Sequence, residues 1–199
     1  MPEAFSKLGG MKRICVFTGS NPGAQEAYGK AAQALGRELV SRGLDLVYGG
    51  ARVGLMGLLA DEVLAAGGEV HGVMPHLLYE REVGHEGLTE LHLVDSMHER
   101  KAMMAELADG FIAMPGGAGT MEELFEVFTW AQLGMHQKPL ALLNVAGYYD
   151  GLIAFLSHAV DEGFLKAAHM GMLLRDSDPG RILDDFADYV PPTIDKWVR

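Results

Sequence analysis

The sequence predicts an α/β fold, a doubly wound parallel sheet of Rossmann-like type with helices on both faces, in a single domain. Three observations predict it. Short apolar runs alternate with longer helical stretches along the chain, glycine-rich turns follow several of the apolar runs, and glycines end the first two helical stretches. Strands separated by helices run parallel, because each helix returns the chain to the same end of the sheet.

The first half of the chain has three such strand-helix steps. The apolar run at 13–18 predicts a strand, and the turn 19–23 follows it. A helix is expected over 24–42, with alanines and leucines on one face and Gly43 at its end. The same reading gives a strand at 44–48, a helix at 54–66 and a strand at 69–74.

A longer polar connection, 76–89, precedes a short strand expected at 90–94. The next helix is predicted over 96–107, because Ser96 suits the N-cap position and Glu99 follows three residues later. The alternation then continues to the end of the chain, with strands expected at 111–114, 139–145 and 172–174 and helices at 124–133, 148–162 and 179–189.

Composition limits the classes of function. The 199 residues suit one domain, expected over 12–190 with a flexible leader (1–11) and a C-terminal tail (191–199). The net charge of -11 argues against a nucleic-acid polymer or an anionic membrane as partner. No apolar run approaches membrane-spanning length. The single Cys15 permits no internal disulfide, so we expect a protein of the reducing cytoplasm.

Three glycine-rich turns, at Gly19-Ser20, Gly49-Gly50 and Gly116-Gly117, follow predicted strands. The carboxyl ends of parallel strands meet at one edge of the sheet, so these turns should converge on a ligand site. None of them matches the dinucleotide fingerprint, and the Walker pattern is absent, which disfavours a nicotinamide dehydrogenase and a P-loop ATPase. The pattern that remains is a phosphate cradle of backbone N–H groups.

The most informative stretch is PGGAGTMEE, residues 115–123. Glycines and the first free N–H groups of a following helix make an anion site. Glu122 and Glu123 stand beside it, where a phosphate would repel them, so they need a reason to be there. The structural alternative is a capping box, in which Glu123 bonds back to the start of a helix capped by Thr120. The preceding proline and glycines favour the functional interpretation, because a cap needs none of them.

Arg100 and Lys101 are adjacent cations near the start of a predicted helix, on the unfavourable side of its dipole. A charge pair usually forms a solvated face. This helix lies one strand before the PGG turn, however, so Arg100 could reach the cleft and offer a planar fork to a phosphate or a ring nitrogen. The eight histidines show no metal spacing with Cys or Asp, so we predict no zinc site and no cofactor.

These residues resemble the Lonely Guy family of cytokinin riboside 5'-monophosphate phosphoribohydrolases. PGGAGTMEE resembles the family's PGGxGTxxE motif, and SMHERK (96–101) resembles its MHxRK segment. The resemblance runs in order and spacing from about residue 12 to residue 189, and it includes the segments 46–57, 128–134 and 142–152.

The resemblance implies an enzyme that hydrolyses the N-glycosidic bond of a purine nucleoside 5'-monophosphate, cytokinin-type or AMP, to the free base and ribose 5-phosphate. It also implies a place in cytokinin biosynthesis, a homodimer, and Arg100 with Glu123 as the catalytic pair. The substrate contacts that it implies are Glu82, Arg100, Lys101, Gly116, Gly117, Ala118, Gly119, Thr120, Met121, Glu122, Glu123 and Thr129.

The chemistry agrees with this interpretation. Cleavage of a ribosyl–base bond builds positive charge on the sugar, which a carboxylate stabilises while it orients or deprotonates water. The amides of residues 117–120 would hold the 5'-phosphate. Arg100 would supply charge either to the phosphate or to the departing base, and the sequence leaves both roles open. It also leaves open whether the base is adenine or an N6-prenylated adenine, and whether the role is hormone activation or salvage.

Three rival functions compete with hydrolysis. The first is a non-catalytic nucleotide or molybdenum-cofactor carrier on the same fold, which shares the cradle but would not need Arg100 and Glu123 together. The second is a pyridoxal-phosphate decarboxylase, a label that some family members carry, which needs a Schiff-base lysine. The third is an interaction module whose glycine turns are only structural.

Overall fold

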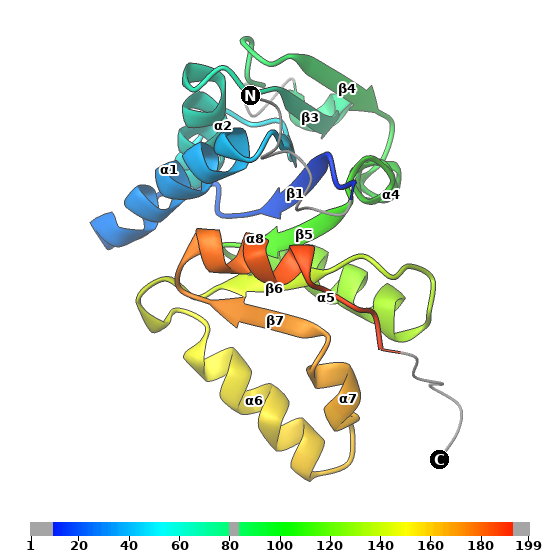
Figure 1. The fold of residues 1–199 in the computed structure, drawn as a ribbon. Coiled ribbons are helices and arrows are strands. Elements are labelled where there is room, and N and C mark those ends of the chain that lie inside the picture. The colour runs from blue at the N-terminus through cyan, green and yellow to red at the C-terminus, as the bar shows by residue number, and fades with distance from the viewer. Residues whose placement is uncertain (1–9, 80–83, 193–199) are drawn as a thin grey trace.

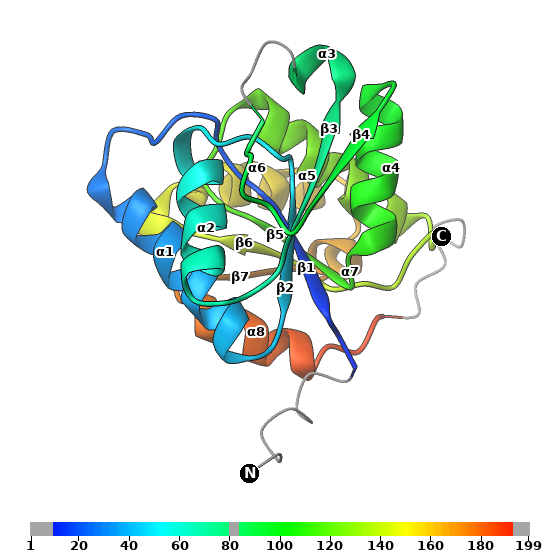
Figure 2. The same cartoon turned by 90° about the horizontal axis from the view of Figure 1, so that it is seen from above.

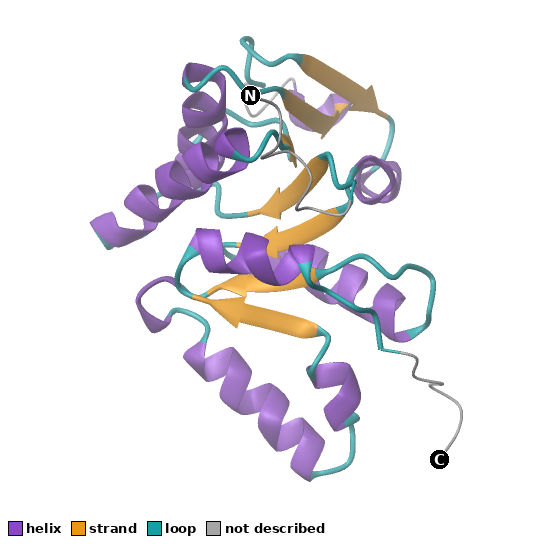
Figure 3. Ribbon diagram, in the orientation of Figure 1, coloured by secondary structure: helices purple, strands orange, loops and turns teal. Residues whose placement is uncertain are grey.

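The computed structural model describes residues 10–79 and 84–192. Its centre is a parallel sheet whose strands are β1 (Arg13–Phe17), β2 (Asp45–Tyr48), β3 (Val70–Pro75), β4 (Glu90–Val94), β5 (Gly110–Ala113), β6 (Leu140–Leu143) and β7 (Leu173–Asp176). The seven strands are ordered β4-β3-β2-β1-β5-β6-β7, and each neighbouring pair is parallel. Figure 1 and Figure 3 show helices on both sides of this sheet. The predicted doubly wound architecture is confirmed.

Helices cover both faces of the sheet. They are α1 (Glu26–Ser41), α2 (Gly54–Ala65), α3 (His76–Tyr79), α4 (Met97–Leu107), α5 (Ala118–Gln132), α6 (Asp150–Asp161), α7 (Ala167–Met170) and α8 (Pro179–Ala187). Helices α1, α2 and α8 pack on one face, and α4, α5 and α6 on the other. Figure 2 shows α1 and α2 to the left of the sheet and α4 to its right. Every residue of β5 and β6 is buried, as expected for parallel strands covered on both faces.

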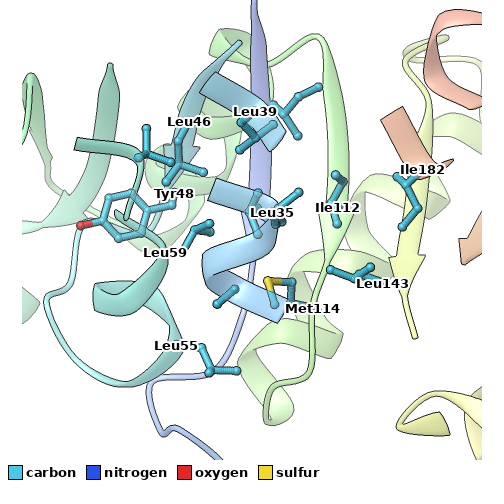
Figure 4. Close-up of a cluster of buried hydrophobic side chains, with 14 of the residues drawn as sticks. Leu35, Leu39, Leu46, Tyr48, Leu55, Leu59, Ile112, Met114, Leu143 and Ile182 are labelled. Carbon is cyan, nitrogen blue, oxygen red and sulfur yellow. The ribbon is translucent and has the colours of Figure 1, made fainter. Parts of the chain in front are cut away.

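The core on the α1 side explains why these elements form. Leu35 and Leu39 stand one turn apart on α1 and are fully buried against Leu46 of β2 and Leu59 of α2 (Figure 4). Ile112 of β5 extends the same cluster across the centre of the sheet. Burying each such side chain contributes about 1.5–3 kcal/mol. This core fixes the sheet from which the turns of the site project.

The strand order places the switch point at β1. Its two neighbours are β2 and β5, and the chain winds outward from β1 in both directions. In open α/β sheets, ligands bind outside the carboxyl ends of the strands at such a point. The turns after β1 and β5 are the Gly19 and PGG turns, so the topology positions the predicted cradle there.

Several predicted boundaries differ from the observed ones. Helix α5 begins at Ala118, whereas the sequence predicted a start at 124, because residues 118–123 read as a loop. The predicted strand 139–145 ends at Leu143, and a 3₁₀ turn, η2 (Val145–Gly147), follows it. The sequence also gave no prediction for the short helices α3 and α7. The predicted leader and tail lie largely outside the described residues, and the proposed domain limits stay a prediction.

The predicted cap of α4 is confirmed. Ser96 is the N-cap, and its Oγ accepts a hydrogen bond from the Glu99 backbone N–H at 3.1 Å. The Glu99 carboxylate in turn accepts from the Asp95 backbone N–H at 2.9 Å. This reciprocal pair fixes where α4 begins, and therefore where Arg100 and Lys101 stand in its first turns. Among the described residues, no helix has both the length and the apolar character that crossing a bilayer requires.

Candidate active site

Two of the three glycine-rich turns are bonded directly to each other. The backbone N–H of Gly19 and the hydroxyl of Thr18 both donate to the carbonyl oxygen of Pro115, each at 3.1 Å. The N–H of Leu55, at the start of α2, donates to the Gly19 carbonyl at 3.1 Å. The turn after β1 therefore joins the PGG turn to the first turn of α2, which confirms that these predicted turns converge.

The start of α5 presents free amides beside open space. Gly117 is the N-cap, and the first helical bond runs from the Met121 N–H to the Gly117 carbonyl at 3.2 Å. The N–H groups of Ala118, Gly119 and Thr120 precede that bond, so they have no partner within the helix. The positive end of the helix dipole lies at the same place. The arrangement suits an anion.

Gly117 and Gly119 are glycines that the fold itself does not require. A Cβ on either would meet no atom within 4 Å, and neither has a φ in the left-handed range. Gly116 differs, because a Cβ there would lie 2.1 Å from the Thr120 hydroxyl oxygen and 2.9 Å from the Gly19 nitrogen. Packing explains Gly116, whereas the space around Gly117 and Gly119 is free for a ligand to approach the backbone.

The capping-box alternative is wrong. Thr120 is buried in the first turn of α5, and the N-cap is Gly117, which has no side-chain cap bond. Glu122 and Glu123 therefore belong to the second turn of the helix, not to its first turn. Thr120 and Glu123, three residues apart, share the buried face of α5. Glu123 is thus turned toward the sheet and not back toward the helix start.

A cavity of about 260 Å³ opens between the turn after β1 and the PGG turn. Three side chains that the sequence reading did not single out line it, namely Tyr28, Leu55 and Tyr148. The Tyr148 hydroxyl donates a hydrogen bond to the Gly116 carbonyl, and its ring packs edge-on against Tyr28. Tyr148 directly follows Gly147 in the turn after β6. A fourth glycine turn at a strand end was the signal that could have found it.

A larger cavity lies elsewhere. It has a volume of about 520 Å³ and is lined by residues of α6, α7 and β7 and their surroundings, including Ser157, Met170 and Arg175. None of the predicted site residues lines it. The smaller cavity at the glycine turns is therefore the candidate site.

The second part of the site is the pair Arg100 and Glu123. Nη2 of Arg100 lies 3.5 Å from Oε1 of Glu123, and the two side chains are only 12% and 10% exposed. The Arg100 Nε–H also donates to the carbonyl of Val73, in the second half of β3, at 3.1 Å. Arg100 is therefore held by the sheet while it faces the carboxylate.

Gly49 leaves room for this arginine. A Cβ at position 49 would lie 2.1 Å from Nη2 of Arg100. The third glycine turn, Gly49-Gly50, thus contributes to the same site, because it leaves space for the Arg100 side chain. Gly50 beside it has a φ of 80°, a conformation that glycine adopts without strain. Both residues are buried, whereas Ser20 in the first turn is exposed.

Burial governs the electrostatics of Glu123. Loss of hydration raises the pKa of its carboxyl group, and the nearby Arg100 charge lowers it only in part. The buried Cys15 thiol on β1 feels the same neighbours. Burial and the charge of Glu123 raise its pKa well above the ordinary value. The carboxyl group is therefore a stronger base than an exposed glutamate, and it lies next to a cation.

Lys101 stands in a different setting from Arg100. Its buried ammonium donates to Glu122 and to Glu126, the latter at 3.1 Å. The hydrogen bond to Glu122 raises the pKa of Lys101, so it stays charged. Glu122 therefore has a structural reason to stand beside the cradle. Of the two carboxylates in the motif, only Glu123 faces Arg100 in the interior.

Two further predicted contacts are not brought to this site. Thr129 is exposed and stands six positions after Glu123, which places it about 9 Å further along α5 on a different face. Met121 is half-buried next to the cluster of the α5 side. Glu82 lies outside the described residues.

The sequence of the chain is similar to those of known proteins. The profile of the family described as "Possible lysine decarboxylase" matches residues 56–186. The chain is 51% identical over 184 residues to the probable cytokinin riboside 5'-monophosphate phosphoribohydrolase LOGL5 of Oryza sativa subsp. japonica, covering 92% of this chain and 75% of that protein. It is 50% identical over 180 residues to the cytokinin riboside 5'-monophosphate phosphoribohydrolase LOG1 of Arabidopsis thaliana, covering 90% and 84%. The chain belongs to this phosphoribohydrolase family.

Solved structures of other proteins share the fold of this chain. The molybdenum cofactor carrier protein from Chlamydomonas reinhardtii superposes with a TM-score of 0.65 at 20% identity, covering 86% of this chain and 94% of that one. A molybdenum cofactor binding protein from Rippkaea orientalis superposes with a TM-score of 0.63 at 23% identity, covering 85% and 91%. At these identities the likeness concerns the fold alone. The family assignment rests on the sequence relatives.

Proposed function

We propose that this protein hydrolyses the N-glycosidic bond of a purine nucleoside 5'-monophosphate, releasing the free base and ribose 5-phosphate. The observation that carries the proposal is the buried pair Arg100–Glu123, with Nη2 and Oε1 3.5 Å apart. Arg100 stands on α4, and Glu123 stands on α5, the helix whose free amides make an anion site. A carrier needs the anion site alone. A buried acid–base pair beside it serves a reaction. The curated relatives, which are half identical to this chain, carry the name of this activity.

The amides at the start of α5 are proposed to hold the 5'-phosphate. Glu123 stands six positions after Gly117, a rise of about 9 Å along the helix. That distance is comparable to the length of a phosphorylated pentose. A phosphate bound at Ala118 and Gly119 would therefore direct the sugar along α5 toward the carboxylate.

Glu123 is proposed to act on the ribose and on water. The departing base leaves positive charge on the sugar, and an adjacent carboxylate stabilises that charge. The same carboxylate can accept a proton from the attacking water, and its raised pKa makes it a better base. In this scheme the proton passes to Glu123 as the water oxygen bonds to C1', and the base leaves with the electrons of the broken bond.

Arg100 is proposed to position Glu123 and to supply charge. Its Nε–H is bonded to the Val73 carbonyl, Nη2 faces Glu123, and among the described residues Nη1 donates only to the Met97 sulfur at 3.7 Å. A phosphate or a ring nitrogen is a stronger acceptor than a thioether sulfur, so a ligand can take over the Nη1 donors. Charge near the leaving group favours its departure, and charge near the phosphate favours binding. The pH dependence of kcat in Arg100→Gln measures how the charge of Arg100 affects the pKa of Glu123, separately from its effect on substrate binding.

A Schiff-base decarboxylase is the weaker alternative. Such an enzyme needs a lysine whose amine is neutral enough to attack a carbonyl carbon, which requires a lowered pKa. Lys101 has a raised pKa because it is bonded to Glu122 and Glu126. The description of the family profile therefore has no support from the chemistry of this lysine.

The test is a release assay with a panel of substrates. Purified protein is incubated with AMP and isopentenyl-AMP, and with the matching unphosphorylated nucleosides. We expect free base and ribose 5-phosphate from the monophosphates, and much slower release from the nucleosides. Binding of AMP without release of adenine would favour the carrier. Equal rates on nucleosides and monophosphates would contradict the phosphate cradle. The ratio between the two monophosphates reports the preferred base.

We also propose a homodimer that works in the cytoplasm. Thr129 is exposed on α5, and the exposed Leu133 and Met135 follow it, with 42% and 68% exposure. A contact from Thr129 to substrate would then be made across a dimer interface. Sedimentation analysis tests the dimer, and a fluorescent fusion tests the location. A monomer at the concentration of the activity assay would contradict the first proposal.

A further inference from the structure

A second cluster of chemically active side chains lies outside the candidate active site. His71 is the second residue of β3, and Glu90 and His92 are the first and third residues of β4. His71 and Glu90 are register partners in the parallel ladder, and Glu90 and His92 alternate onto the same face of the edge strand. The three residues therefore gather at the amino ends of the strands, at the opposite edge of the sheet from the candidate active site.

The buried imidazole of His71 carries the argument. Its side chain is only 5% exposed, yet neither Nδ1 nor Nε2 has a hydrogen-bond partner among the described residues. Three carboxylates face it, with Glu90 at 3.4 Å from Nδ1, and Glu69 at 3.8 Å and Asp45 at 4.0 Å from Nε2. A buried polar ring without hydrogen bonds is costly, and three negative charges around it call for a cation. Arg13 offsets one of them, at 3.7 Å from Asp45.

The donor atoms have the spacing of a metal site. Oε2 of Glu90 lies 3.4 Å from Nδ1 of His71 and 3.4 Å from Nε2 of His92. Zinc binds such atoms at about 2.0–2.1 Å, so two ligands at the tetrahedral angle stand about 3.3–3.4 Å apart. All of the ligand atoms of this set lie within 4.8 Å of one another. Nε2 of His92 also has no hydrogen-bond partner within the part of the chain that the structure describes.

The surroundings of His71 complete the arrangement. When Nδ1 binds a metal, the Nε2–H faces the carboxylates of Asp45 and Glu69. A ligating histidine commonly directs its other nitrogen to a carboxylate, which orients the ring and strengthens its bond to the metal. The exposed Glu90, at 56%, leaves the site open to solvent on one side. A fourth ligand position is thus available to water.

We propose that His71, Glu90 and His92 form a binding site for a divalent transition metal, with zinc as the ion that their donor set fits. Two imidazoles and one carboxylate suit zinc and neighbouring transition metals, whereas magnesium and calcium prefer oxygen alone. A bound ion joins the edge strand β4 to β3. The residue two places after His71 on β3 is Val73, whose carbonyl holds Arg100, so the ion would also stiffen the strand that anchors the arginine.

The sequence reading predicted no zinc site because it sought histidines spaced with Cys or Asp. The ligands here are a histidine and a Glu-x-His pair 19 residues further along, and only the pairing of β3 with β4 brings them together. The local signal was the i, i+2 spacing of Glu90 and His92, which puts two donors on one face of a strand. Glu-x-His is common enough in sequences that this signal alone has little specificity.

Metal binding to the untagged full-length protein tests the proposal directly. The protein is treated with a chelator, dialysed, and titrated with Zn²⁺ and separately with Mg²⁺ by calorimetry. We expect saturable binding of one Zn²⁺ per chain and a higher Tm with Zn²⁺, and neither effect with Mg²⁺. The absence of saturable Zn²⁺ binding would overturn the proposal.

Two variants locate the site. Glu90→Gln and His92→Gln alter side chains that are partly exposed, so both proteins should fold, which the Tm without metal verifies. Each variant should weaken Zn²⁺ binding by about 100-fold or more, since even outer partners of a ligand are worth roughly 10–100-fold. His158→Gln, an exposed histidine of α6, is the matched control and should bind as the parent does. Unchanged affinity in both site variants would place the metal elsewhere and refute the assignment.

Discussion

Nη2 of Arg100 lies 3.5 Å from Oε1 of Glu123, although the two residues stand on different helices, α4 and α5. The arginine is fixed to β3 through the Val73 carbonyl, and the glutamate follows β5. These strands belong to opposite halves of the sheet, on either side of the switch point at β1. The geometry of the pair therefore depends on both halves of the sheet.

Glu123→Gln should lower kcat by roughly 100-fold or more while KM changes little, because the carboxylate acts on the transition state and the cradle binds the phosphate. Base release from AMP and isopentenyl-AMP measures both constants. Glu106→Gln, an exposed glutamate of α4, is the matched control and should keep full activity. Turnover near the parent value in Glu123→Gln would remove Glu123 from the mechanism.

The same variant makes a prediction about stability. Because burial raises the pKa of Glu123, the folded protein holds this proton to a higher pH than the unfolded chain does. The favourable contribution of Glu123 is therefore fully present below its unfolded pKa of about 4.3, and it is lost as pH rises through the folded pKa. Glutamine stays neutral at every pH. We expect Glu123→Gln to melt above the parent at pH 8, with the difference shrinking toward pH 4.

Calorimetric or fluorescence melts at the two pH values provide the measurement. A Tm below that of the parent at pH 8 would mean that the charge of Glu123 stabilises the fold. The glutamate would then be a structural partner of Arg100 and not a strained functional group.

Arg100→Gln should shift the pH dependence of the reaction. The charge of Arg100 lowers the pKa of Glu123, so removing it lets that pKa rise further. If ionised Glu123 is required, the acidic limb of the kcat profile moves to higher pH than in the parent. Arg100→Lys keeps the charge but cannot reproduce the planar contacts to Val73 and Glu123, so it should lose kcat with a smaller shift of the limb. An acidic limb at the same pH in all three proteins would contradict the coupling.

Gly49→Ala should damage activity more than stability. The added Cβ would lie 2.1 Å from Nη2 of Arg100, which is the far end of a flexible side chain and can move away. Misplacing a reacting group by about 1 Å can cost on the order of 100-fold in rate. We expect kcat to fall by that order while the free energy of unfolding changes by less than about 1 kcal/mol. Gly151→Ala, in open space on α6, serves as control; equal kcat values for the two variants would argue against the clash.

Gly117→Ala and Gly119→Ala should separate binding from folding. Neither new methyl group meets an atom within 4 Å. Gly119 lies inside α5, where alanine is favoured over glycine by up to about 1 kcal/mol, so the Tm of Gly119→Ala should hold or rise. Gly117 is the N-cap, where alanine is less favoured than glycine, so the Tm of Gly117→Ala should hold or fall slightly. If a phosphate lies against these amides, the methyl groups hinder it, and KM for AMP should rise at least about 10-fold. Unchanged KM in both variants would move the phosphate away from the start of α5.

The fold could be read from the sequence because each strand is a short apolar run buried on both faces. Strands such as β5 and β6 leave little ambiguity. The position at which α5 begins could not be predicted from the sequence. Its first residues, Ala118, Gly119 and Thr120, include two with low helix propensity, and packing of Thr120 into the interior overrides that preference. The same error made the capping box look plausible.

The site was predictable in part. Glycines at strand ends indicate an edge of the sheet, so the convergence of the turns followed from topology. The partners of Lys101 did not, because they depend on which faces of α4 and α5 meet. Two adjacent cations with similar sequence settings therefore differ, one in an ion-pair network with Glu122 and Glu126 and the other against Glu123 and Val73. The spacing of residues in the sequence cannot predict that difference.

The absence of a side chain at position 49 has a consequence for how such chains can diverge. Nη2 of Arg100 lies only 2.1 Å from where a Cβ would stand. A lineage that acquired any larger residue at 49 while retaining arginine at 100 would have to displace the guanidinium group from its carboxylate partner. Positions 49 and 100, 51 residues apart, should therefore change together or not at all during evolution.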